Sequence, residues 1–147
     1  MQVCDVMTAD PACCTPDTRI REVAKLMVEH DCGVVPVVEQ VQHRKPVGVV
    51  TDRDIAIRLV AEDRDPRTIA VEAAMTRATV TVEPEADIEE AALRMYQNRL
   101  RRILVVDDDG ICVGMLSLAD VAGAMTAAKV AAVLEGVSRR GASPLPR

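Results

Sequence analysis

The chain has 147 residues and a formal net charge of −5, with an isoelectric point near 5.0. The length suits one ordinary domain or two very small modules that share a core. The acidic balance argues against a general nucleic-acid binder, which would show a basic face. Trp and Phe are absent and Tyr occurs once, so the core has to be built from Val, Ile, Leu, Ala and Met. The short runs of Val and Ile favour strands.

The predicted elements of the first half begin with a short extended segment at 13–15, which leads through a proline into a helix. That helix is indicated by apolar residues at helical spacing. They are residues 20, 23, 24, 27 and 28. A buried strand, VVPVV, follows at 34–38, and the polar stretch 40–46 predicts a hairpin loop. A second strand at 47–50 ends at Thr51, where another helix is expected to begin.

The second half repeats this order. VMT at 6–8 falls on AMT at 74–76 when the sequence is shifted by 68 residues. After the longer loop of the first half the shift is 66, and GVVTDRD at 48–54 falls on GMLSLAD at 114–120. Both halves therefore predict the order β-α-β-β-α, which is an α/β (α+β) fold. At about 60 residues neither half can bury its sheet face alone, so the two should pack together.

The segments between and after the repeats set the expected boundaries. We predict a first module at 1–60, a charged connector at 61–73 and a second module at 74–125. Residues 126–147 are expected to form a C-terminal helix extension and a disordered tail, because the tail has little to bury.

No targeting or membrane segment is predicted. The first ten residues are polar and acidic, unlike a signal peptide. The longest mostly apolar stretch, 121–137, is rich in alanine, carries a lysine and is too short to cross a bilayer. We therefore expect a soluble cytoplasmic protein that contacts no membrane.

The repeated Gly-x-x-Thr/Ser-x-x-Asp pattern has two interpretations. In the first, Thr51 and Ser117 cap helices: the hydroxyl accepts a backbone N–H and the aspartate three residues later reaches back. In the second, the helix start binds an anion. The hydroxyl then bonds a phosphate, the carboxylate accepts ribose hydroxyls, and Gly48 and Gly114 let a flat ring approach the backbone. Neither interpretation supplies a nucleophile–base pair, so we expect no catalytic residues and no enzyme activity.

Together these motifs resemble a tandem pair of CBS modules, the regulatory modules first named after cystathionine β-synthase. The resemblance covers about residues 3–125. The matching stretches are DVMT at 5–8, VVPVVE at 34–39, GVVTDRD at 48–54, ILVVDDDG at 103–110 and GMLSLAD at 114–120. It implies two modules packed about a pseudo-twofold axis, with two clefts that bind adenine nucleotides or adenosyl compounds.

The resemblance also implies which residues form each cleft. The first cleft would combine Thr51, Arg53 and Asp54 with Arg101 and Arg102, and with Ala78 in the loop that contacts the base. The second would combine Ser117 and Asp120 with Gly33 and Val34, and with Asp10 in the equivalent loop. The first set holds three arginines, whose planar guanidinium groups suit phosphate oxygens, whereas the second holds none.

The resemblance further implies a homodimer that acts through an unknown effector protein, with no resident cofactor and the nucleotide as ligand. Two alternatives stay open. One is a ligand-free structural or interaction module, a dimerisation unit whose Thr/Ser-x-x-Asp pairs are only caps. The other is a redox- or zinc-responsive stress protein that uses Cys13, Cys14 and Cys32, although their spacing matches no standard zinc pattern and no metal ligands are assigned.

Overall fold

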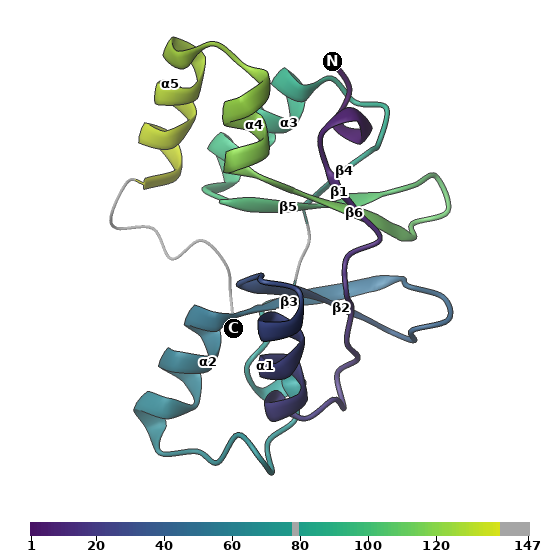
Figure 1. The fold of residues 1–147 in the computed structure, drawn as a ribbon, viewed down its shortest axis with the longest axis vertical. Coiled ribbons are helices and arrows are strands. Elements are labelled where there is room, and N and C mark those ends of the chain that lie inside the picture. The colour runs from purple at the N-terminus through teal and green to yellow at the C-terminus, as the bar shows by residue number, and fades with distance from the viewer. Residues whose placement is uncertain (78–79, 139–147) are drawn as a thin grey trace. The chain divides into compact units, whose positions relative to one another are not determined.

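The computed structural model describes residues 1–77 and 80–138, which form two compact units (Figure 1). Unit 1 contains residues 1–11 and the later half of the chain from Val80. Unit 2 contains the intervening residues from Ala12. The first eleven residues therefore pack with the second half of the sequence. Ala78 and the predicted tail beyond residue 138 lie outside the described residues.

Unit 2 is built on an antiparallel hairpin of β2 (Val34–Val38) and β3 (Pro46–Thr51). Its helices α1 (Ile20–Glu29) and α2 (Asp52–Arg58) lie on one face of that hairpin (Figure 1). Single β-bridges extend the hairpin on both sides. Cys14 pairs in parallel with Val37, and Thr76 pairs antiparallel with Val49. Two 3-10 turns, Val60–Glu62 and Val71–Ala73, complete the unit.

Unit 1 carries the same plan with longer outer strands. Its four-stranded sheet has the order β1-β6-β5-β4. The strands are β1 (Thr8–Ala9), β4 (Thr81–Val82), β5 (Arg102–Val106) and β6 (Cys112–Ser117). The helices are α3 (Ile88–Asn98), α4 (Leu118–Ala124) and α5 (Ala127–Ser138), and a 3-10 turn spans Val3–Asp5. The predicted α/β fold with its repeated β-α-β-β-α order is confirmed.

The two hairpins share one register. Val34 pairs with Thr51 in unit 2, and Arg102 pairs with Ser117 in unit 1. In an antiparallel pair, directly opposed side chains point to the same side of the sheet. The hydroxyl that precedes each short helix therefore lies beside the first residue of the neighbouring strand.

Each unit has its own aliphatic core. In unit 2 the helix α1 buries Ile20 and Val23 against the hairpin, where Val35, Val37 and Val50 are fully buried. In unit 1 the corresponding cluster is formed by buried residues of α3, β5 and β6. It includes Ile88, Ala91, Met95, Ile103, Val105 and Leu116. Of the apolar stripe predicted for the first helix, Ile20 and Val23 are buried and Met27 is partly buried, whereas Ala24 and Val28 are exposed, Val28 to 82%.

The helix extension predicted after residue 125 is α5, which packs on α3. Lys129 forms an ion pair with Glu89. At Gly136 a Cβ atom would lie 2.0 Å from Cδ2 of the Tyr96 ring, so only glycine permits this approach. Among the described residues, no helix is both long and apolar enough to span a membrane.

Candidate functional site

Thr51 ends β3 and caps α2. Its Oγ1 accepts the N–H of Asp54 at 3.0 Å, and its own N–H donates to Oδ2 of Asp54 at 3.0 Å. Two N–H groups at the helix start are thereby satisfied by one reciprocal pair, which is the capping box. The capping interpretation of the first motif is confirmed.

Ser117 and Asp120 repeat this arrangement at the start of α4. The Ser117 Oγ accepts the N–H of Asp120 at 3.2 Å, and the Ser117 N–H donates to Oδ2 of Asp120 at 2.7 Å. The Ser117 hydroxyl also lies 2.7 Å from the same carboxylate oxygen, to which it donates. An ionised carboxylate offers about four acceptor positions. Capping therefore uses only part of what each aspartate can accept.

The two aspartates differ in their surroundings. Asp54 is 8% exposed, and its Oδ1 lies 3.8 Å from Nη1 of Arg58, one helical turn later. Asp120 is half-buried, and the position that matches Arg58 is Ala124. Sequence reasoning missed Arg58. The available signal was the i, i+4 spacing of an aspartate and an arginine on one helix.

The remaining candidate residues of unit 2 lie close to Thr51. Val34 is its partner in the hairpin, and the carbonyl oxygen of Gly33 accepts the N–H of Asp52 at 3.0 Å. Arg53 is exposed on the first turn of α2. The structure therefore brings the Thr51–Asp54 cap together with Gly33 and Val34.

In unit 1 the candidate arginines lie beside the second motif. Arg102 is the hairpin partner of Ser117, and the Arg101 carbonyl accepts the N–H of Leu118 at 3.0 Å. Both arginines are exposed. Asp10 is also exposed, has φ 45°, and donates its N–H to the Val113 carbonyl at 3.1 Å. The predicted clefts group residues from different units, and this grouping stays a prediction.

Each motif glycine lies so close to another segment of its own unit that a side chain there would clash. A Cβ at Gly48 would lie 2.5 Å from the backbone oxygen of Thr76. A Cβ at Gly114 would lie 2.4 Å from Sδ of Met7. The sequence predicted room for a flat ring at these glycines. The structure shows that other segments of the same unit approach them.

The cysteines provide no metal centre in the part of the chain that the structure describes, where no three His, Cys, Asp or Glu residues are placed to hold an ion. Burial raises the pKa of the Cys14 thiol from 9.0 to about 12, so this thiol stays protonated. Its Sγ donates to the Pro36 carbonyl at 3.7 Å. Cys14 therefore behaves as a small packed residue, because metal ligation needs the thiolate.

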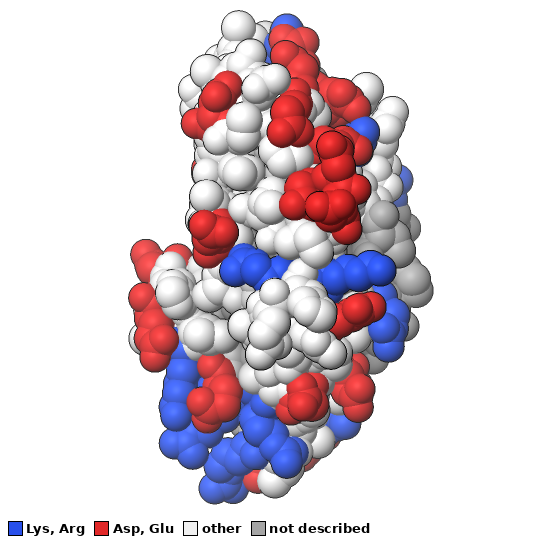
Figure 2. Space-filling model, turned by 90° about the vertical axis from the view of Figure 1, so that its right-hand side faces the viewer, with Lys and Arg blue, Asp and Glu red and all other residues white. Residues whose placement is uncertain are grey.

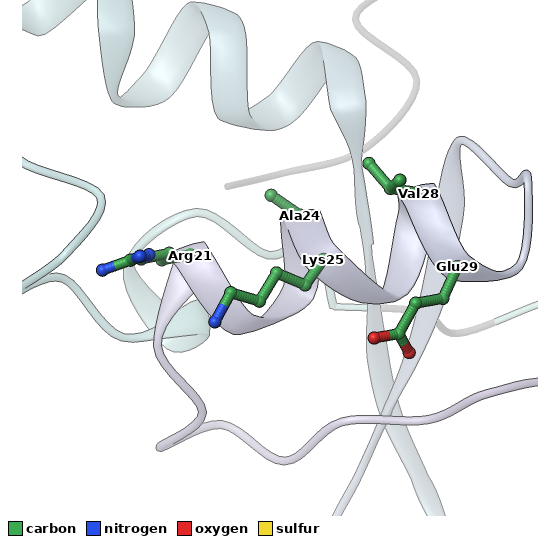
Figure 3. A pocket seen from close by; sticks show the side chains of 5 residues that line it. All are labelled: Arg21, Ala24, Lys25, Val28 and Glu29. Atoms are coloured by element: carbon green, nitrogen blue, oxygen red, sulfur yellow. The ribbon is translucent and has the colours of Figure 1, made fainter.

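A shallow hollow of the described surface lies away from both motifs. It measures about 340 Å³ and is lined by one face of α1, from which Arg21, Ala24, Lys25, Val28 and Glu29 project (Figure 3). Acidic and basic side chains both occur on the face drawn in Figure 2, and the basic ones gather toward its lower end with acidic ones among them.

Two CBS domains account for most of the chain. Residues 3–61 and 71–127 match the family model of the CBS domain. The chain therefore belongs to the CBS domain family, as a tandem pair. The CBS domain-containing protein YhcV of Bacillus subtilis is 39% identical over 118 residues, which cover 80% of this chain and 81% of that protein.

Solved structures of CBS proteins share the fold. CBSX2 in complex with AMP superimposes with a TM-score of 0.69 at 27% identity, over 84% of this chain and 94% of that one. The CBS domain pair of MJ0100 with 5′-methylthioadenosine and S-adenosyl-L-methionine gives a TM-score of 0.74 at 27% identity, with 84% and 94% covered. Hypoxic Response Protein I with two coordinated zinc ions gives 0.73 at 28% identity, with 86% and 100% covered.

Proposed function

We propose that this chain is a regulatory protein that binds an adenine nucleotide or an adenosyl compound and catalyses no reaction. One observation carries the proposal. Both domains of a tandem CBS pair place a Thr/Ser-x-x-Asp cap at the start of a short helix, and structural neighbours of this pair bind AMP and S-adenosyl-L-methionine. Asp54 and Asp120 are the proposed acceptors for ribose hydroxyls, and Arg102 is a proposed phosphate ligand. The cytoplasmic location stays a prediction.

A thermal-shift screen with AMP, ADP, ATP, S-adenosyl-L-methionine and zinc chloride tests the ligand class. A ligand at about 100 times its dissociation constant adds about 2.7 kcal/mol of stability. We expect this stabilisation from an adenine compound. A flat response to all nucleotides would support the structural module, and a response to zinc alone would support the zinc-responsive alternative.

Titration calorimetry of AMP and adenosine then tests the residues. Asp54→Ala is expected to weaken both ligands about ten- to a hundredfold, the size of a lost hydrogen bond to a charged group. Arg102→Ala should weaken AMP more than adenosine, because only AMP carries a phosphate. Arg64→Ala, which removes an exposed arginine away from both motifs, is the control and should change neither affinity. Equal losses of AMP and adenosine affinity in Arg102→Ala would contradict the phosphate role.

The same titrations decide which aspartate works with Arg102. The cleft inferred from the family groups Arg102 with Asp54. The hairpin register, by contrast, puts Arg102 beside Ser117 and hence near Asp120. We expect the double variant of Arg102 and Asp54 to be non-additive for AMP, and that of Arg102 and Asp120 to be additive. The reverse result would assign the arginine to the site within unit 1.

The proposal includes a homodimer formed through α1, and the internal repeat supports this choice of face. In unit 1, α5 contacts Glu89 and Tyr96 of α3. The matching positions of unit 2 are Arg21 and Val28, which are exposed. Antiparallel pairing of two α1 helices would set the basic first half of one against Glu29 at the end of the other.

Light scattering tests this dimer. At micromolar concentration we expect twice the mass of the 15.9 kDa chain. Val28→Glu should give single chains of unchanged stability, because Val28 is 82% exposed within the chain. The control is Val60→Glu, which charges a 65% exposed valine outside α1. A wild-type mass of one chain would contradict the homodimer, whatever the outcome for nucleotide binding.

A further inference from the structure

Arg58, the last residue of α2, is a buried cation that holds a segment distant in sequence. It is 8% exposed. Its Nη1 donates to the carbonyl oxygens of Ala74 at 2.8 Å and Met75 at 2.9 Å, and to Oγ1 of Thr76 at 3.1 Å. One guanidinium nitrogen thus contacts three consecutive residues of the same unit. Unit 1 has Ala124 at the matching position and lacks this cation.

The same nitrogen also faces the candidate site. It lies 3.8 Å from Oδ1 of Asp54, and both side chains are about nine-tenths buried, at 10% and 11% exposure. The other carboxylate oxygen, Oδ2, accepts the N–H of Thr51. The carboxylate of Asp54 therefore faces the helix cap with one oxygen and Arg58 with the other.

The segment that Arg58 holds is seated against β3. Thr76 exchanges two backbone hydrogen bonds with Val49, each 2.8 Å long. The neighbouring Gly48 has no side chain, and its backbone approaches the Thr76 carbonyl too closely for a Cβ. Two residues beyond Thr76 is Ala78, where the family resemblance places the loop that contacts the base. Arg58 thus connects the proposed ribose acceptor with the segment that leads to that loop.

The environment of Arg58 indicates that its contacts with residues 74–76 are sensitive to the Asp54 carboxylate. Within the described residues, its Nε is a buried side-chain nitrogen without a hydrogen-bond partner. An unpaired buried donor is unfavourable, so the contacts of Nη1 must outweigh it. Removing one partner of a buried ion pair leaves the other charge uncompensated, which is strongly unfavourable. A change at the Asp54 carboxylate is therefore expected to alter how firmly Arg58 holds residues 74–76.

We propose that Arg58 is a positioning residue that transmits the state of the Asp54 carboxylate to the segment Ala74–Thr76. The coupling is a property of the ligand-free chain. Its use in ligand binding rests on the proposed function: a nucleotide that engages Asp54 with its ribose would also set the segment leading to its base. Asp120 has no such link in unit 1, because Ala124 cannot replace the guanidinium.

Amide hydrogen exchange on the full chain tests the coupling without a ligand. The reporters are the amides of Met75 and Thr76, which bond to the carbonyls of Val71 and Val49, measured relative to the amides of β2. Asp54→Asn should accelerate their exchange about tenfold or more. In an Arg58→Met background, adding Asp54→Asn should leave these rates unchanged. Equal acceleration in both backgrounds, or none in either, overturns the proposal.

A matched control comes from unit 1. Asp120→Asn removes the corresponding carboxylate charge, and the reporter is the amide of Met7, which bonds to the Val3 carbonyl and matches Met75 in the repeat. Its exchange rate relative to the amides of β5 should not change. A tenfold acceleration there would show that such coupling needs no arginine and would contradict the role of Arg58. Arg58→Gln, which removes the charge and keeps a polar side chain, replaces Arg58→Met in the cycle if the latter does not fold.

Addition of AMP separates this proposal from the proposed function. In the wild-type chain, AMP should slow exchange at Asp54, Met75 and Thr76 together. In Arg58→Met, AMP should slow exchange only at the amide of Asp54. A purely structural role for Arg58 would leave the AMP effect at all three residues intact, and this outcome contradicts the proposal. If AMP slows the exchange of no amide in the wild-type chain, the proposed nucleotide binding is contradicted. The coupling in the ligand-free chain is then still tested by Asp54→Asn in the wild-type and Arg58→Met backgrounds.

Discussion

The two units have the same kind of helix cap, but the residues around the cap differ. Thr51 with Asp54, and Ser117 with Asp120, form capping boxes of the same pattern. Around them, unit 2 places a buried arginine, whereas unit 1 has an alanine at that position and exposed arginines at the start of the neighbouring strand. Residues three apart in sequence fix the cap. The surroundings of each aspartate come both from the next turn of its own helix and from segments distant in sequence.

The same contrast holds at other matched positions. A Cβ at Gly48 would meet the backbone of Thr76, whereas a Cβ at Gly114 would meet the side chain of Met7. Cys14 occupies the place of Val82, each on an outer strand position of its sheet. These pairs allow the comparison to be tested by equivalent substitutions in the two units, because the repeat supplies the control for each change.

The largest difference is expected for alanine at the two motif glycines. In Gly48→Ala the new Cβ would lie 2.5 Å from the Thr76 carbonyl oxygen, so a backbone segment has to move. In Gly114→Ala the obstacle is the Met7 Sδ, the flexible part of a side chain that can change rotamer. Overpacking costs about 1–3 kcal/mol, and we expect about 3 for Gly48→Ala and about 1 for Gly114→Ala.

Urea unfolding of the two alanine variants measures this difference. The gain from replacing a strand glycine, about 0.5–1 kcal/mol, applies to both and cancels in the comparison. Equal losses of unfolding free energy would mean that segment 74–76 yields as easily as the Met7 side chain. That result would contradict the close seating of this segment on β3.

The sequence predicted the elements well where the signal was local. The strand at 34–38 and the caps at Thr51 and Ser117 follow from runs of valine and from spacings within one helical turn. The repeat predicted that both halves fold alike, and the register of the two hairpins agrees. The strands and caps depend on residues that are near neighbours along the chain, and the repeat is found by comparing the sequence with itself, so a single sequence contains these signals.

The sequence could not predict which segments the motif glycines contact. Arg58 and the segment 74–76 are 16 or more residues apart, and nothing in the composition of either marks the pairing. The ligand argument assigned Gly48 to a flat ring, but Thr76 lies there. Likewise, the placement of residues 1–11 with unit 1 rests on long-range strand pairing of β1 with β6.

Alkaline pH should separate the two units at Cys14. Burial raises the pKa of this thiol from 9.0 to about 12, whereas the matching Val82 has no proton to lose. Below pH 9 the native and unfolded chains both keep the proton, and stability does not change. Between pH 9 and 12 the unfolded chain loses it and the native chain does not. Stability therefore falls by about 1.4 kcal/mol per pH unit.

Cys14→Val isolates this effect, because it puts the unit 1 residue into unit 2. Unfolding free energies at pH 8 and pH 10 should differ by about 1.4 kcal/mol more in the wild type than in the variant. Alkylation gives a second measurement. Cys4 is exposed and should react with iodoacetamide at pH 8, and Cys14 should not. An identical alkaline loss in both chains would show that another group is responsible.

The smallest effects concern the caps themselves, and here the two units should agree. Thr51→Ala and Ser117→Ala each remove the hydroxyl that accepts an N–H, from Asp54 at 3.0 Å and from Asp120 at 3.2 Å. Each should cost about 1 kcal/mol of unfolding free energy, the usual value for a lost N-cap. The exchanged pair, Thr51→Ser and Ser117→Thr, keeps both hydroxyls and should be nearly neutral in urea unfolding. If Thr51→Ala costs several times more than Ser117→Ala, the cap in unit 2 is not an independent local feature. Its loss then also disturbs Asp54 and Arg58, and the two units differ even where their sequences match.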